Sequence, residues 1–332
     1  MKPWQCVPGS AIWQYGLRMA TLFDQSPTFD RVAFRERLAA LARRRVLVGT
    51  SSWKYPGWLD QIYSPFRYAT RGRFSKKRFE AECITEYAET FPTVCGDFAF
   101  YQFPSEAFWE TLFSRVPQQF VFSLKVPEQI TRVEFARLAR YGAQSGQSNP
   151  SFLDTELMKS EFLKPLERHR TNLAVLILEF GSFPAEHIRP VGRFVEALDH
   201  FLRSMPRDFR FGVEVRNAEL LVPEYFACLR ANHVAHVFNC WTRMPDPSAQ
   251  MSLPESTSAD FVVCRALLRP GRSYELAVKK FEPYTDLKDP YEPARQAIRN
   301  LIGSQVGREV YIYVNNRLEG NAPLTIEAIL GG

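Results

Sequence analysis

Short apolar runs alternate along the chain with longer segments in which apolar residues recur every three or four positions. Eight of the short runs predict buried β-strands, because they are apolar and rich in β-branched and aromatic residues. These runs cover residues 45–51, 93–101, 120–127, 173–180, 209–216, 233–240, 260–267 and 309–316. Helical spacing between them predicts helices at 76–91, 105–116, 191–205, 223–232 and 292–305.

Strands that alternate with helices in this way predict an α/β fold, a single (β/α)8 TIM-type barrel over residues 45–332. Residues 1–44 form an N-terminal extension with one helical segment, in which Val32, Phe34, Leu38 and Leu41 lie on or near one stripe. A doubly wound open sheet is the alternative, but no GxGxxG sequence follows the first strand.

Two polar segments predict long loops. Residues 137–156 are rich in Gly, Ser and Asn, and residues 241–258 are rich in Pro and Ser. The first follows the third strand, so we expect it on the C-terminal face of the barrel, where a substrate loop or lid belongs.

Composition narrows the class of protein. The chain has 332 residues, of which 45% are hydrophobic and 23% charged, and it contains no apolar run long enough to span a membrane. We therefore expect no membrane partner, and the N-terminus has no apolar signal-peptide core. The six cysteines are scattered and no paired His motif occurs, so we expect reduced thiols in the cytoplasm, no metal and no cofactor.

The net charge of +6 is distributed unevenly along the chain. Residues 1–80 hold 15 Lys and Arg against 5 Asp and Glu, whereas the remainder holds 27 against 31. The densest basic stretch, RYATRGRFSKKRF, runs through residues 67–79. A charge run is most often a solvated face, and the alternative is a site for an anionic ligand or nucleic acid between Arg67 and Arg78.

Polar residues gather where the predicted strands end. In a barrel of this kind the C-terminal ends of the strands carry the active site. The first strand ends at Ser51 and leads into Trp53, and every later strand has a charged or amide side chain near its end. These side chains are Asp97, Lys125, Glu179, Glu214, Arg216, Asn239, Arg265, Asn315 and Asn316.

Strand parity indicates which of these side chains face the barrel interior, because successive residues point to opposite faces. Parity points Lys125, Glu214, Arg216 and Asp97 inward. It also groups Cys95, Asp97 and Tyr101 on one face of the second strand. For Glu179 and Arg265 parity is indecisive, because both faces of their strands are apolar.

Two interpretations of these charges remain open. One is a structural ion-pair network of Glu214 with Arg216 and Lys125. The other is a ligand site in which Glu179 and Glu214 perform acid/base chemistry while the cations hold a phosphate or carboxylate. Cys95 and His236 are more simply interpreted as packing residues.

The segment after the eighth strand, YVNNRLEGNAPLTIEAIL, concentrates polar side chains beside Gly320. Asn315, Asn316 and Glu319 stand before a helix that we expect to begin near Pro323, with its N-terminus toward the same rim. Either a phosphate-binding loop or an ordinary capped turn fits this pattern.

Five segments together resemble one known family. The segments VGTSSWKYPGWLDQIY, EYAETFPTVCGDFAFYQFPS, FVFSLKVPEQIT, FGVEVRN and YIYVNNRLEGNAP resemble the YecE-like family, a domain of unknown function (DUF family 72). The resemblance implies a TIM-barrel fold over residues 46–330, with no established activity. It implies that Trp53, Tyr55 and Trp58 belong to the first rim loop. Cys95 and Asp97 stand where the family more usually has Glu and Asn.

Three functions follow as hypotheses. The first is an enzyme acting on an anionic small molecule, such as a sugar phosphate or nucleotide, with catalytic residues Glu214, Glu179, Asp97 and Lys125. Its binding residues would be Ser51, Trp53, Tyr55, Trp58, Tyr101, Arg216, Asn239, Arg265, Asn315, Asn316 and Glu319. The second is a nucleic-acid-binding or processing protein that uses the basic segment and the rim aromatics. The third is a non-catalytic ligand-binding scaffold.

Overall fold

Eight parallel strands close into a barrel in the computed structural model, which describes residues 29–183, 191–304 and 307–331. The strands follow one another around the barrel in chain order, and β1 pairs with both β4 and β10 to close it. The barrel strands are β1 (Val46–Ser51), β4 (Thr93–Gly96), β5 (Val121–Lys125), β6 (Leu173–Phe180), β7 (Phe211–Val215), β8 (Ala235–Cys240), β9 (Phe261–Ala266) and β10 (Glu309–Val314). All eight predicted strands are therefore confirmed, and so is the barrel.

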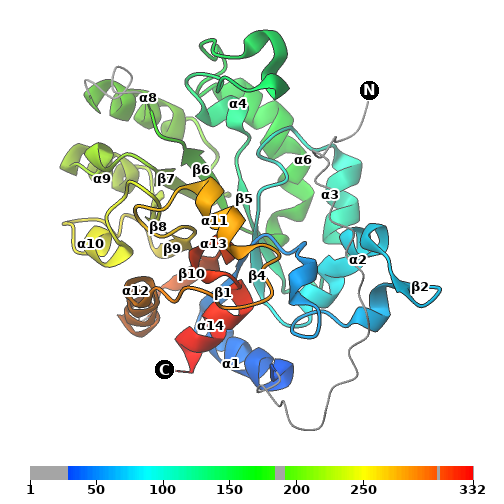
Figure 1. Ribbon diagram of the computed structural model, residues 1–332. Coiled ribbons are helices and arrows are strands. Elements are labelled where there is room, and N and C mark those ends of the chain that lie inside the picture. The colour runs from blue at the N-terminus through cyan, green and yellow to red at the C-terminus, as the bar shows by residue number, and fades with distance from the viewer. Residues whose placement is uncertain (1–28, 184–190, 305–306, 332) are drawn as a thin grey trace.

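Helices surround the strands, as Figure 1 shows. The longer ones are α1 (Arg31–Arg43), α2 (Lys76–Ala88), α3 (Glu106–Phe113), α8 (Val191–Arg203), α9 (Pro223–Ala231), α11 (Tyr274–Phe281), α12 (Glu292–Ser304) and α14 (Ala322–Leu330). Short ones are α4 (Glu128–Thr131), α5 (Thr155–Leu157), α6 (Lys164–Leu166), α10 (Pro247–Met251) and α13 (Asn316–Glu319). A two-stranded antiparallel hairpin of β2 (Ala69–Thr70) and β3 (Arg73–Phe74) lies outside the barrel.

The second barrel strand is shorter than its apolar run suggested. β4 ends at Gly96, and the chain turns through residues 97–101, with Phe100 N donating to the Asp97 carbonyl over 3.0 Å. Strand parity does not extend through a turn. The prediction that Asp97 and Tyr101 share a strand face with Cys95 is therefore wrong.

The helix of the N-terminal extension packs directly on the barrel. Three residues of α1, namely Phe34, Leu38 and Leu41, are buried in the apolar core between the helices and the strands. Val32 is 57% exposed. Each residue of a helix is rotated by about 100° from the last, which carries Val32 off the stripe that the other three share. The expectation was thus correct for three of the four residues. Residues 1–28 of the extension lie outside the described residues.

One of the two expected loops contains a helix. Within residues 241–258, α10 packs against β8, and its Gln250 is buried. The side chain of Gln250 donates to the carbonyls of Asn239 and Pro245, which ties the segment down despite its Pro and Ser content. The loop after β5 is largely irregular, with a 3-10 turn at Ala139–Gln144.

Two apolar cores flank the strands. The outer one lies between strands and helices, and the inner one fills the barrel with side chains that include Val175, Ile177, Val237, Val263 and Tyr313. Beyond the inner core, toward the C-terminal ends of the strands, the inward-facing side chains become charged.

No helix among the described residues is long and apolar enough to cross a membrane.

Candidate functional site

Four of the eight barrel strands, β5, β6, β7 and β9, place charged side chains at the C-terminal mouth of the barrel. Lys125 ends β5, Glu179 lies near the end of β6, and Arg265 lies near the end of β9. Glu214 of β7 is in register with Glu179, so the two carboxylates start from adjacent strands at the same height. Their inward direction follows from parity, since Leu178 and Val213 beside them face the outer core. The structure thus resolves the orientation that parity left open for Glu179 and Arg265.

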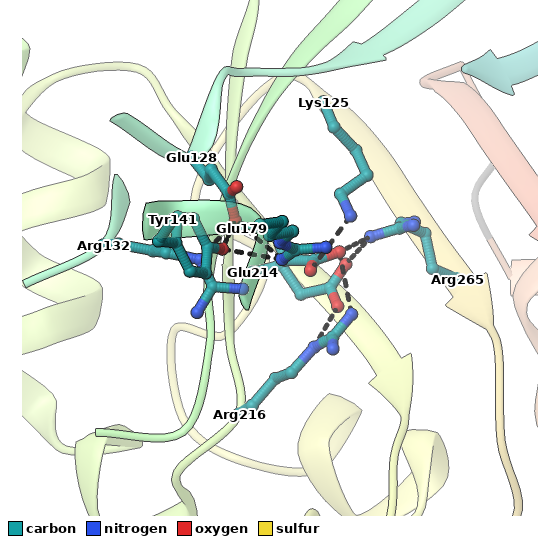
Figure 2. A network of polar contacts seen from close by, with 9 residues as sticks. Lys125, Glu128, Arg132, Tyr141, Glu179, Glu214, Arg216 and Arg265 are labelled. Carbon is teal, nitrogen blue, oxygen red and sulfur yellow. Dashed lines mark hydrogen bonds and ion pairs between the residues drawn. The ribbon is translucent and has the colours of Figure 1, made fainter. Parts of the chain in front are cut away.

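These side chains form one ion-pair network with Arg216, which follows β7 (Figure 2). Glu179 accepts from Lys125 Nζ at 3.1 Å through Oε1, and from Arg216 at 2.7 Å and Arg265 at 2.8 Å through Oε2. Glu214 accepts from Arg216 Nε at 3.1 Å and also pairs with Arg265 Nη1. We call these five residues, Lys125, Glu179, Glu214, Arg216 and Arg265, the mouth network.

The mouth network is buried and carries one excess positive charge, since three cations face two carboxylates. The Glu214 side chain is fully buried, whereas Lys125 and Arg216 keep 10% and 12% of their side-chain surface exposed. A buried charge is costly unless another charge balances it. The two partly exposed cations are therefore the ones that a ligand entering from the mouth meets first.

Burial and charge shift the pKa values in opposite directions within this network. Burial alone would raise the pKa of Glu179, but the three neighbouring cations outweigh it and hold that pKa well below its usual range. Burial lowers the pKa of Lys125, against the opposing field of Glu179. Glu179 is consequently ionised at neutral pH and is a weak base.

Two aromatic rings flank the cations. Lys125 Nζ lies 3.5 Å from the centroid of Phe100, and the Arg216 guanidinium lies 3.6 Å from the centroid of Trp241. Sequence reasoning did not single out either ring. Trp241 had a usable signal, because it directly follows the last residue of β8, and Trp53 likewise comes two residues after the end of β1. Phe100 had none, because its position depends on the turn after β4.

A second network lies beside the first, on the loop after β5 (Figure 2). The buried carboxylate of Glu128 accepts from Tyr141 Oη at 2.8 Å and pairs with Arg132 and Arg140. The Arg140 guanidinium also lies 4.6 Å from the ring of Tyr101, which is 47% exposed. Tyr101 thus belongs to the outer edge of the mouth, not to the barrel interior.

Near the C-terminal ends of the strands, three buried polar atoms on inward-facing positions have no hydrogen-bond partner among the described residues. They are Ser51 Oγ on β1, Asn239 Oδ1 on β8 and Arg265 Nε on β9. Asn239 uses its amide nitrogen to donate to the carbonyls of Val215 and Val237. These atoms retain donor and acceptor capacity for polar groups of a ligand.

The aromatic residues of the first rim loop pack inward instead of lining the mouth. Trp53 is 4% exposed and contacts the rings of Phe98 and Phe122. Trp58 is fully buried and donates from its indole nitrogen to Asn316 Oδ1 at 3.1 Å. Tyr55 is partly buried against the ring of Tyr284, and burial raises its pKa to about 12.

The polar residues after β10 have partners of their own within the fold. Asn315 caps α13 by accepting from Arg317 N at 2.9 Å. Glu319 is fully buried and pairs with Arg295 of α12 at 2.8 Å. These contacts hold α12 and α13 together, so the capped-turn interpretation accounts for Asn315 and Glu319.

Two further candidates occupy separate surroundings. Asp97 is exposed and lines a cavity of about 170 Å³ with Ser52, Trp53 and Lys54. Cys95 faces the inner core, and burial raises its pKa to about 11, which suits a packing residue better than a reactive thiolate. Within the described part of the chain, no group of three or more His, Cys, Asp or Glu could hold a metal ion.

The basic segment lies apart from the mouth. Residues 67–78 run from a 3-10 turn through the β2–β3 hairpin into α2. Figure 1 shows β2 at the edge of the molecule, whereas α11 and α13 lie over the barrel. The segment therefore contributes no side chain to the mouth network.

Comparison with known proteins agrees with this architecture. A family model described as "Protein of unknown function DUF72" matches residues 47–331. A DUF72 family protein from Thermotoga maritima is 20% identical, with a TM-score of 0.56 over 86% of this chain and 96% of that one. A DUF72 family protein from Enterococcus faecalis is 17% identical, with a TM-score of 0.55 over the same shares of the two chains. No curated protein matches the chain.

Proposed function

The chain belongs to the DUF72 family of proteins of unknown function, and on that premise we propose that it is an enzyme acting on an anionic small molecule. The proposed site is the C-terminal mouth of the barrel. The proposed substrate class is a sugar phosphate or a nucleotide-like molecule. The cytoplasm is the proposed compartment, because the five described cysteines are buried free thiols.

One observation carries the proposal, namely the excess positive charge of the buried mouth network. A phosphate or carboxylate that reached Arg216 and Lys125 would balance this charge and form charge-assisted hydrogen bonds. Trp241 and Phe100, which stand against the two cations, would form apolar walls for the remainder of the ligand.

The charge states suggest a division of roles. Lys125, at 3.1 Å from Glu179, suits a proton donor because burial lowers its pKa. Glu179 stays ionised and only weakly basic, so its proposed catalytic role is to hold the protonated form of Lys125 in place. Glu214 contacts Arg216 and Arg265 and would position both guanidinium groups. Asp97 remains a proposed participant, since its charge acts on Lys125 from the turn after β4.

The test is calorimetric titration with ribose 5-phosphate, adenosine monophosphate and inorganic phosphate, and with neutral ribose and adenosine for comparison. We expect at least one phosphorylated compound to bind while its neutral counterpart does not. Arg216→Gln should weaken that binding roughly tenfold or more, because a charge-assisted bond is lost. The matched control is Arg170→Gln, which removes a guanidinium paired with Asp208 at the opposite end of the barrel.

Two results would contradict the proposal. Failure of every anionic compound to bind would exclude an open anion site at the mouth. Recovery of a bound ligand unchanged after prolonged incubation would favour the non-catalytic scaffold. If turnover is found, Glu179→Gln should lower kcat more than it changes KM, because proton transfer belongs to the chemical step.

Nucleic-acid processing at the mouth has less support. That hypothesis required Trp53, Tyr55 and Trp58 to stack on bases, and both tryptophans are buried. The basic segment is a separate surface, and its charges need an explanation of their own.

A further inference from the structure

Six basic residues and no acidic residue occupy the surface formed by residues 66–78. Three of the six are paired with acidic residues of α2 or the turn after it. Arg67 pairs with Glu89 at 2.6 Å, Lys76 with Glu80 at 3.7 Å, and Arg78 with Glu82 at 3.0 Å. Arg71, Arg73 and Lys77 are exposed, and their side chains have no ion-pair or hydrogen-bond partner in the described part of the chain.

The backbone presents one of these free cations at a position that arginine does not favour. β2 and β3 are joined by Arg71 and Gly72, both with positive φ, at 52° and 74°. A two-residue turn of this kind favours Asn or Asp before Gly, because those residues tolerate the left-handed region. Arg71 at the tip is therefore not explained by the stability of the hairpin.

The start of α2 shows the same conflict between charge and local stability. Lys76, Lys77 and Arg78 fill its first turn, which contains no acidic residue. The N-terminus of a helix carries partial positive charge, so acidic residues stabilise this position and basic residues do not. The helix dipole adds to the positive field of the side chains.

An unpartnered aromatic ring lies within this basic surface. Phe66 is 89% exposed, in the 3-10 turn Pro65–Tyr68 that leads into β2. Phe74 of β3, in contrast, is only 36% exposed and contacts the ring of Phe79 at 5.7 Å. A partner that covered the exposed ring of Phe66 would gain the free energy of removing its apolar surface from water.

We infer that this surface, from Phe66 to Arg78, binds single-stranded nucleic acid, with Phe66 stacking on a base while Arg71, Arg73 and Lys77 contact phosphates. Exposed aromatic rings beside a basic track are how proteins hold single strands without reading their sequence. An anionic membrane is the less suitable partner. One exposed ring offers little apolar area, and the adjoining α2 displays charges, not an apolar face.

The experiment is fluorescence anisotropy of a labelled 15-nucleotide oligo-dT with the full chain at two salt concentrations. Three phosphate contacts predict a slope of about −2 in log K against log [salt], hence a roughly 20-fold weaker affinity at 200 mM than at 50 mM salt. The triple variant Arg71→Ala, Arg73→Ala, Lys77→Ala should lose most of the affinity and most of the slope. Phe66→Ala should weaken binding roughly tenfold and leave the slope unchanged, because stacking involves no counterion release.

A matched triple variant distinguishes binding by this surface from binding that depends only on the net charge of the protein. The control variant Lys164→Ala, Arg193→Ala, Lys279→Ala removes three exposed cations from elsewhere on the molecule. Like Arg71, Arg73 and Lys77, these have no side-chain partner among the described residues. The control variant should leave oligo-dT binding intact. Equal loss in both triple variants would overturn the inference, because binding would then follow overall charge.

Two further results would overturn it. One is failure of the wild-type protein to bind oligo-dT at 50 mM salt. The other is binding to anionic phospholipid vesicles, lost in Phe66→Ala, together with no binding to oligo-dT. Arg216→Gln should leave oligo-dT binding unchanged, so the outcome is independent of the small-molecule site proposed at the mouth.

Discussion

Each charged residue of the barrel mouth depends on partners from other strands. Glu179 is the centre of the network, because Lys125, Arg216 and Arg265 all contact it. Removing one partner from a buried ion-pair network usually costs more than the network contributes as a whole, because the remaining charges stay buried without compensation.

Glu179→Gln tests this dependence. It leaves three buried cations facing one carboxylate, so we expect the free energy of unfolding to fall by about 3–5 kcal/mol. Urea denaturation followed by circular dichroism measures the change. Glu156→Gln is the control, since Glu156 is 85% exposed in its pair with Lys159 and should cost less than about 1 kcal/mol. A loss below 1 kcal/mol for Glu179→Gln would show that the mouth network tolerates uncompensated charge.

Individual residues also show for which positions strand parity predicts the direction of a side chain. Parity oriented Lys125 and Glu214 because each lies inside a regular strand. Parity could not place Tyr101, which lies in a turn. It also could not predict that Trp58 donates a hydrogen bond to Asn316, a residue near the other end of the chain. A rule with period two describes direction within a strand but says nothing about which distant segment packs against it.

Contacts between elements determine the environment of His236. This residue lies on the outer face of β8, where its ring nitrogens contact Tyr225 of α9 at 3.1 Å and Gln250 of α10 at 3.3 Å. The interpretation of His236 as a packing residue is confirmed, since it is 1% exposed. Burial lowers its pKa from 6.5 to about 4.

This pKa shift predicts how stability depends on pH. Well above pH 6.5 the imidazole is neutral in both the folded and unfolded states, so it contributes no pH dependence there. As the pH falls toward 4, the unfolded chain binds a proton that the folded one excludes, and stability decreases. At pH 5 the loss from His236 is about 2 kcal/mol.

His236→Gln retains hydrogen-bonding capacity and removes the titration. Comparing the free energies of unfolding at pH 7 and pH 5, we expect the variant to lose about 2 kcal/mol less than the wild type does. His200→Gln, on the exposed face of α8, serves as the control. Equal losses in wild type and His236→Gln would mean that the folded protein admits the proton.

The whole barrel closes only if β1 pairs with β4, which are the first and second barrel strands in chain order. β1 pairs with β4 only through Thr50 and Ser51, beside Gly49. A Cβ at Gly49 would collide with the carbonyl oxygen of Thr93 and lie 3.1 Å from its Cγ2. Glycine is required here because the two backbones approach so closely.

Gly49→Ala should therefore destabilise the molecule by about 3 kcal/mol or more, since the backbone of β4 must move to admit the methyl group. The midpoint of guanidinium unfolding measures the effect. In Gly192→Ala the new methyl group meets no atom of the described residues within 4 Å, so stability should stay the same or rise by up to about 1 kcal/mol. Unchanged stability of Gly49→Ala would mean that β4 can move away from β1 without a loss of free energy of unfolding.

Regular local patterns were enough to predict the elements and the barrel. Alternation of apolar runs with helical spacing located all eight strands, because each pattern is set by neighbours along the chain. Where a segment lacked a pattern, prediction stopped. The whole 241–258 segment was expected to be a loop, and the helix α10 within it is held by the long-range contacts of Gln250.

The sequence alone was therefore sufficient for the strands, most of the longer helices, the closed α/β barrel and the end of the barrel at which charge accumulates, since these follow from periodicity and strand direction. Which charges meet was decided only by the tertiary structure. Glu179 joins cations from β5, β9 and the end of β7, and Trp53 and Trp58 turn into the core instead of the mouth. Such contacts join residues far apart in the chain, and their geometry depends on barrel closure, which no local pattern encodes.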